Sequence, residues 1–224
     1  MSIARHHAEW LSLVEVSGPF LSMPVLMRVF PQGLEAHDAD RVRQLRIAYE
    51  EWEDNEQAGR RRNPAIHGQW IRFVLRNLLE LPEACIAEGQ AIPQTLQADM
   101  TKHGELLRPD ILIKNPEGGP SCGKPRLLIQ TYPSTQDLSK PVPGYTWKAS
   151  PDTRMMELLH ATGVRLGLVT NGEHWMLVDA PRNGTTGFAS WYAHLWLEEP
   201  ITLRAFTSPV QRQPFLRRPQ QRHA

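Results

Sequence analysis

The sequence predicts an α/β fold in which helices flank a mixed central sheet, preceded by an N-terminal helical region. Through much of residues 1–107, apolar side chains recur with the helical period of 3.6 residues. From residue 108 the pattern changes to short apolar runs bounded by glycine and proline, which are typical of buried strands. Asn171-Gly172, between two such runs, is the strongest short-range signal of a β-hairpin.

The helical region contains three predicted helices. Apolar periodicity places the first at residues 4–16. Asp38 is a suitable N-cap for the second, which merges into a charged run at residues 50–56. Asn63 and the proline that follows it begin the third. Residues 83–107 have no clear pattern, so no element is predicted there.

The second half of the chain alternates strands with a helix that begins at Pro151 and ends at Gly163. This order of elements predicts a sheet whose neighbouring strands are joined by hairpins and by one helical crossover. The predicted strands cover residues 111–113, 126–131, 164–169, 174–178 and 187–192, and a last helix covers 194–207.

Composition indicates an ordinary globular protein with no bulk attraction to nucleic acid. Apolar residues make up 41% of the chain, charged residues 22%, and the formal net charge is +1. Two cysteines, Cys85 and Cys122, give neither a disulfide framework nor a cysteine-based zinc pattern. No apolar run approaches the roughly 18 residues of a membrane span, and residues 1–9 do not read as a signal peptide, so we expect a cytoplasmic protein.

Three parts are predicted along the chain: a mainly helical part at 1–107, an α/β core at 108–207 and a tail at 208–224. The tail contains four arginines, three prolines and no acid, a composition typical of disorder. It is either solvated or a nucleic-acid-binding arm, and the composition favours the first interpretation. Residues 60–62, three consecutive arginines, either contact phosphates or form a solvated charge run.

The candidate catalytic residues lie at or next to the first two predicted strands. Asp110 immediately precedes one strand, and Gln130 lies near the end of the next. Metal-dependent nucleases hold a hard cation between an aspartate at one strand end and an acid on the neighbouring strand. A lysine two residues beyond that acid shares its strand face and positions or deprotonates a water. In this chain that position is Tyr132.

These residues resemble the PD-(D/E)XK nuclease superfamily. Pro109-Asp110 is similar to its first motif, and residues 127–130 to the strand that leads to its second. Residues 161–175 look like the helix-to-strand passage of type I and type IIG restriction enzymes. Residues 15–22 resemble the start of large restriction-modification proteins that join such a domain to an adenine-specific DNA methyltransferase, some of them in phage-defence islands.

The resemblance implies a restriction-endonuclease-like core, Mg²⁺-dependent hydrolysis of DNA and a methyltransferase partner. Asp110 would ligate Mg²⁺, Gln130 would give a carbonyl ligand, and Glu15, or else Glu105, would be the upstream helix glutamate of the metal site. Two positions depart from the family pattern. Gln130 replaces an acid and carries no charge, and Tyr132 replaces the lysine of the catalytic set. The nearby lysines that could substitute for it are Lys124, Lys140 and Lys148.

Two functions from different classes therefore remain open. One is a nuclease-like domain of a bacterial restriction-modification or phage-defence system. The other is a non-catalytic DNA-binding or partner-docking module of the same fold, such as a truncated restriction-modification protein. An unrelated α/β binding protein is a third interpretation. Four tryptophans either stack on bases or pack in the core, and core packing is favoured; they are Trp147, Trp175, Trp191 and Trp196.

Overall fold

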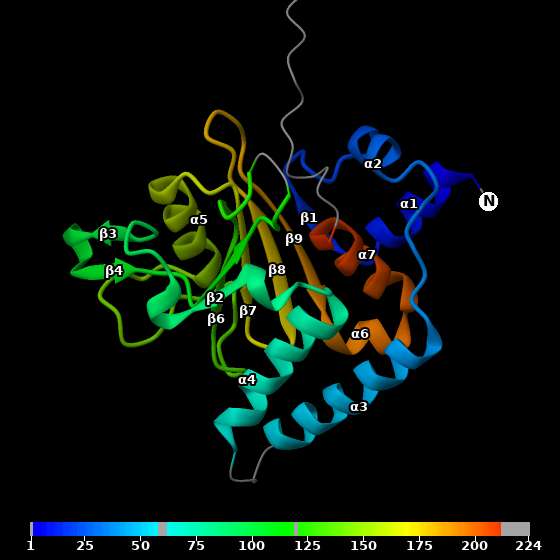
Figure 1. The fold of residues 1–224 in the computed structure, drawn as a ribbon, viewed down its shortest axis with the longest axis horizontal. Coiled ribbons are helices and arrows are strands. Elements are labelled where there is room, and N and C mark those ends of the chain that lie inside the picture. The colour runs from blue at the N-terminus through cyan, green and yellow to red at the C-terminus, as the bar shows by residue number, and fades with distance from the viewer. Residues whose placement is uncertain (1, 58–61, 119–120, 212–224) are drawn as a thin grey trace, which may run out of the picture.

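A mixed seven-stranded sheet forms the centre of the protein (Figure 1). The computed structural model describes residues 2–57, 62–118 and 121–211. Strands follow the order β1-β9-β8-β7-β6-β5-β2, and every neighbouring pair is antiparallel except β6 and β7. The strands are β1 (Glu15–Ser17), β2 (Ile86–Glu88), β5 (Ile111–Lys114), β6 (Pro125–Thr131), β7 (Leu166–Thr170), β8 (His174–Asp179) and β9 (Gly187–Tyr192).

Helices cover both faces of this sheet (Figure 1). On one side lies α5 (Pro151–Thr162), with a small hairpin of β3 (Ala98–Met100) and β4 (Glu105–Leu107). The α/β prediction with a mixed central sheet is thereby confirmed. The helices on the other side are α1 (Ile3–Leu11), α2 (Met23–Val29), α3 (Ala39–Glu56), α4 (Pro64–Phe73), α6 (Ala193–Glu198) and α7 (Pro200–Gln211).

Each central strand is buried on both faces, which explains the continuous apolar runs in the sequence. Successive side chains of a strand point to opposite faces. On β6, Leu127 and Ile129 join the larger core beneath α3, α4 and α7, whereas Leu128 joins the α5-side core. A strand covered by helices on one side only would have shown alternating polar residues instead.

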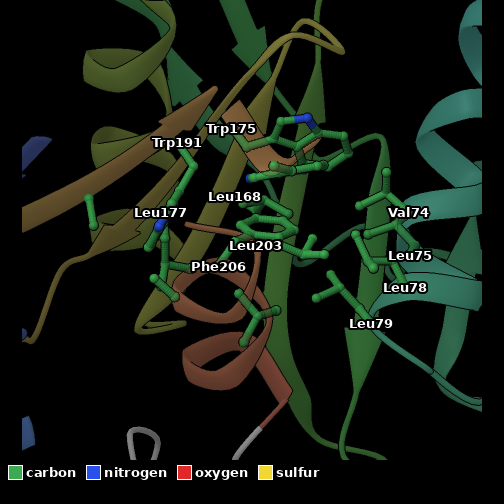
Figure 2. Close-up of a cluster of buried hydrophobic side chains, with 14 of the residues drawn as sticks. Val74, Leu75, Leu78, Leu79, Leu168, Trp175, Leu177, Trp191, Leu203 and Phe206 are labelled. Atoms are coloured by element: carbon green, nitrogen blue, oxygen red, sulfur yellow. The ribbon is translucent and has the colours of Figure 1, made fainter. Parts of the chain in front are cut away.

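The larger core is rich in aromatic rings (Figure 2). The rings of Trp196 and Phe206 stack with centroids 4.6 Å apart, and Trp175 and Trp191 each meet Phe206 edge-on. These three tryptophans are fully buried, so the prediction of core packing is confirmed for them. A π-helical turn that continues α4 contributes the opposite wall of this cluster, through Val74, Leu75, Leu78 and Leu79 (Figure 2).

The predicted hairpin at Asn171-Gly172 joins β7 to β8. Asn171 Oδ1 accepts hydrogen bonds from the backbone N–H groups of Glu173 (3.1 Å) and His174 (2.7 Å). Gly172 has a φ of 91°, a conformation that favours glycine. Its carbonyl oxygen accepts the indole N–H of Trp70 at 2.7 Å and that of Trp175 at 2.9 Å. The turn therefore ties α4 to the sheet.

The N-terminal region differs from the expected one. The first helix ends at Leu11, and Glu15–Ser17 form β1, an edge strand that pairs with β9. Three residues are too few to produce a period, so this strand depends on its partner. The same reason applies to residues 83–107, which contain β2, β3 and β4. The helical prediction for residues 12–16 is wrong.

The predicted start of the tail, residue 208, is wrong, because the preceding helix continues to Gln211. Residues 208–211 are the last turn of α7, with Ser208 and Val210 buried. Arg126 Nη2 donates to the carbonyl oxygen of Val210 at 2.9 Å, which fixes the helix end against β6. The rest of the predicted tail, residues 212–224, lies outside the described residues. Within the described part of the chain, no helix combines the length and the apolar character needed to cross a bilayer.

We predict that Gly172→Ala strongly destabilises the protein. A methyl group at this position would lie 2.8 Å from the Trp52 ring, and alanine would have to keep the left-handed conformation that the turn requires, which an L side chain disfavours. The two effects together should lower the free energy of unfolding by about 2–5 kcal/mol, measured by urea denaturation.

Gly144→Ala is the matched control, because Gly144 has a similar φ of 85° and nothing within 4 Å of the added carbon. It should cost only the backbone strain of about 1–2 kcal/mol. Equal losses in the two variants would contradict the packing role of Gly172.

A neutral histidine joins α1 to the end of α2. Trp10 Nε1 donates to His7 Nδ1 at 3.1 Å, so the His7 proton is on Nε2, which donates to the Phe30 carbonyl at 3.0 Å. His7 is fully buried, and this burial lowers the pKa of its imidazole below the usual 6.5, partly opposed by the bond to Phe30. Protonation therefore favours the unfolded state.

Consequently, the free energy of unfolding should fall as pH decreases below about 6.5, because the unfolded chain binds a proton that folded His7 resists. Urea denaturation between neutral and mildly acidic pH measures this slope. His7→Asn should reduce the slope, whereas Ile47→Ala, at an exposed position of α3, should leave it unchanged. An unaltered slope in His7→Asn would refute the assignment.

Candidate functional site

Asp110 and Gln130 are brought together at one end of the sheet. Ile111 pairs with Ile129 across β5 and β6, so Asp110, just before β5, lies opposite Gln130. The Asp110 N–H donates to the Ile129 carbonyl at 2.9 Å, which extends this pairing to the start of the strand. The neighbourhood expected from the strand order is therefore present.

Tyr132 shares their face of the sheet. Leu112 and Leu128 belong to the α5-side core, so Asp110 and Gln130, two residues from them, are on that same face. Tyr132 follows β6 and packs against this core. The three residues predicted for the catalytic set thus lie beside α5, at a common strand end.

Thr131 orients the Asp110 carboxylate. Asp110 Oδ2 accepts the backbone N–H of Thr131 at 2.7 Å and its hydroxyl at 3.2 Å. Burial of the carboxyl group raises the pKa of Asp110, and these two hydrogen bonds oppose the rise, although the residue as a whole keeps much of its surface exposed. Asp110 is therefore an oriented, partly desolvated acid at the end of a strand.

Neutral hydrogen-bonded groups occupy the other two positions. The Gln130 side chain is buried; its Nε2 donates to the Arg108 carbonyl at 3.2 Å, and its Oε1 accepts from the Tyr132 hydroxyl at 3.5 Å. Burial raises the pKa of Tyr132 well above its ordinary value, so the phenol stays protonated. The site has no charge at the position where the family pattern has a lysine.

A buried ion pair that sequence reasoning missed lies next to these residues. Arg154 of α5 pairs with Glu105 of β4, and both side chains are more than nine-tenths buried. Besides the larger effect of burial, Arg154 lowers the pKa of Tyr132, so its charge acts on the site. The sequence signal that could have indicated this pair is Arg154 itself, which lies one turn before Leu158 on the apolar side of a predicted helix.

The two predicted helix glutamates do not join Asp110. Glu15 is on β1 and accepts from the Tyr192 hydroxyl at 3.5 Å. Five inter-strand spacings separate β1 from β5, roughly 24 Å. Glu105 is on a strand rather than a helix and is neutralised by Arg154. The expected third ligand is therefore not supplied by either residue.

Among the described residues, no hydrogen bond or ion pair joins any of the three candidate lysines to Asp110. Lys124 lies in the β5–β6 connection, at the opposite end of the hairpin from Asp110. Lys140 pairs with Asp137 at 3.1 Å, and Lys148 Nζ donates to the Tyr145 carbonyl at 3.0 Å. Of the arginine run, Arg62 pairs with Glu56, while residues 60 and 61 lie outside the described residues.

The oxygen donors at the site are one carboxylate and one amide. Among the described residues, no cluster of three or more acids, histidines or cysteines could hold a metal ion. Mg²⁺ is held in many enzymes by one or two carboxylates, with waters and substrate phosphates as the other ligands. Asp110 and Gln130 fit such a site only with a single carboxylate and one amide oxygen as protein ligands, so that waters and the substrate supply the other oxygens.

Comparison with known proteins gives no match: no family model, no curated protein and no solved structure is significantly similar to this chain.

We predict that Thr131→Val raises the pKa of Asp110, because a hydroxyl that stabilises the carboxylate is lost while the backbone hydrogen bond remains. The carboxyl ¹³C shift of Asp110, followed by NMR against pH, measures the change. Thr146→Val, at an exposed position outside this contact, should leave the titration unaltered. A pKa that stays the same or falls in Thr131→Val would contradict the orienting role of Thr131.

Proposed function

We propose that this chain is a nuclease-like domain of a bacterial restriction-modification or phage-defence system, with Mg²⁺-dependent hydrolysis of DNA phosphodiesters as its ancestral chemistry. One observation carries the proposal. Asp110 and Gln130 are cross-strand neighbours at the same end and on the same face of the sheet, with Tyr132 two residues beyond Gln130. This is the relation between the first acid, second acid and lysine positions in the sequence resemblance.

The order of elements around the site supports a restriction-endonuclease-like core as the finer description of the fold. Strands β2, β5 and β6 are consecutive antiparallel neighbours. Helix α5 then crosses from β6 to β7, which run parallel. Such a crossover returns the chain to the same end of the sheet, so the ends of β6 and β7 meet where Asp110 begins β5.

In this proposal Asp110 and Gln130 would hold Mg²⁺. The ion would supply an activated water and stabilise the charge that develops on the phosphate. Thr131 keeps the Asp110 carboxylate oriented through one oxygen, and the Arg108 carbonyl fixes the Gln130 amide by accepting from its nitrogen. Tyr132 cannot replace a lysine as a cation, because its phenol is neutral.

A second candidate function is a non-catalytic module that binds DNA or docks on an adenine-specific DNA methyltransferase. The hydrogen bonds among Arg108, Gln130 and Tyr132 favour it. They join the second-acid and lysine positions into a neutral network, whereas a working site would aim charged groups at water and phosphate. The two functions therefore differ in whether Asp110 is required for cleavage.

A plasmid-nicking assay with Mg²⁺ or Mn²⁺ distinguishes them. If the domain is a nuclease, wild type should nick slowly, and Asp110→Ala should lose this activity. Asp99→Ala, an exposed acid on β3, should behave as wild type. Equal nicking by wild type and Asp110→Ala would overturn the nuclease proposal, whereas DNA binding without cleavage by either would favour the second function.

Restoring the missing groups provides a sharper form of this experiment. The double variant Gln130→Glu, Tyr132→Lys should increase metal-dependent nicking at least about tenfold, since a carboxylate ligand and a general base or orienting cation contribute 10²–10⁴-fold where geometry is right. Adding Asp110→Ala to this variant should abolish the gain. No gain in a folded double variant would contradict the proposed site geometry.

A further inference from the structure

Three aromatic rings gather on the α5 side of the sheet, away from the large core. His103 ends the short 3₁₀ turn before β4, and Tyr145 and Trp147 belong to the segment that precedes α5. The rings of His103 and Trp147 are stacked, with centroids 5.2 Å apart and an interplanar angle of 12°. Tyr145 is 47% exposed. These three residues are here called the aromatic platform.

A buried arginine holds the platform from beneath. The guanidinium carbon of Arg154 lies 4.5 Å from the centroid of the Tyr145 ring and 5.1 Å from that of Trp147. Arg154 also donates to the Trp147 carbonyl at 3.1 Å and pairs with Glu105. Both rings are therefore fixed before any ligand arrives, which reduces the entropy lost on binding.

Lysines flank the platform. Lys102 immediately precedes His103, and Lys148 immediately follows Trp147; both are exposed. Of the acids on the neighbouring elements, Glu105 is paired with Arg154 and Asp152 accepts the Ser150 hydroxyl, whereas Asp99 of β3 is exposed. In a chain whose net charge is only +1, this local combination of cations and rings is a distinct feature.

Trp147 differs in burial from the other tryptophans considered for base stacking. Trp175, Trp191 and Trp196 are at most 1% exposed within the large core, whereas Trp147 is only half-buried. Trp147 and Tyr132 pack against the same α5-side core. Arg154 and Tyr145 of the platform region also act electrostatically on the Tyr132 phenol, as Asp110 does, so the platform lies near the end of β6 that carries Gln130.

We propose that the aromatic platform, with Lys102 and Lys148, binds single-stranded DNA. Bases stack on the exposed Tyr145 ring beside the His103–Trp147 pair, and the two lysines contact the backbone phosphates on either side. Every base has a flat aromatic face, so this recognition does not depend on sequence. The inference deepens the proposed function, because it names an unpaired strand beside Asp110 as the ligand; the binding itself requires no cleavage.

Fluorescence anisotropy of the full chain with a labelled oligothymidylate of about 12 nucleotides, in EDTA and low salt, tests the proposal. Tyr145→Leu keeps the bulk of the side chain but removes the aromatic face, so it should weaken binding about 5- to 100-fold. Tyr145→Phe should bind as wild type. Lys148→Gln should reduce the slope of log Kd against log salt concentration by about 0.7, as expected for one lost phosphate contact.

Ile47→Ala is the control, because Ile47 is 61% exposed on α3 and far from the platform; its affinity should equal that of wild type. The proposal is overturned if wild type does not bind the oligonucleotide, if Tyr145→Leu binds as tightly as wild type, or if a duplex of equal length competes equally well. Asp110→Ala should still bind in EDTA. Loss of nicking and loss of binding therefore report separately on the proposed function and on the platform.

Discussion

The carbonyl oxygen of Gly172 connects the N-terminal helices to the central sheet. It accepts an indole N–H from Trp70 of α4 and another from Trp175 of β8. A buried carbonyl can accept two hydrogen bonds, and each indole N–H would be costly to bury without a partner. The N-terminal helices are therefore fixed on the sheet by a turn that the chain reaches a hundred residues later.

A second set of hydrogen bonds connects the N-terminal helices to the candidate site. Trp52 Nε1 donates to His67 Nδ1 at 3.0 Å, so His67 carries its proton on Nε2 and donates it to the Tyr132 carbonyl, also at 3.0 Å. The end of β6 is thereby held from the α3–α4 side, while the Tyr132 ring faces the α5 side. The backbone that positions Gln130 is thus fixed from both layers.

The α5 side uses a buried charge for the same purpose. Burying the Arg154–Glu105 pair has a desolvation cost that its attraction only partly offsets, so the pair is weak evidence of added stability. It joins the β3–β4 hairpin, the segment before α5 and α5 itself through one guanidinium. Such a group specifies one arrangement of three elements, and the aromatic platform is a consequence of that arrangement.

The sequence alone determined the elements whose patterns are local. The strands from β5 to β9, the hairpin at Asn171-Gly172 and the pairing of Asp110 with Gln130 all follow from apolar runs, turn chemistry and strand order. Tertiary structure decided the rest. Strands of three residues such as β1 have no period and exist through their partners, which also places Glu15 at the far edge of the sheet. The burial of Arg154 depends on Glu105, because a charged side chain is buried only where the tertiary structure places a group of opposite charge beside it.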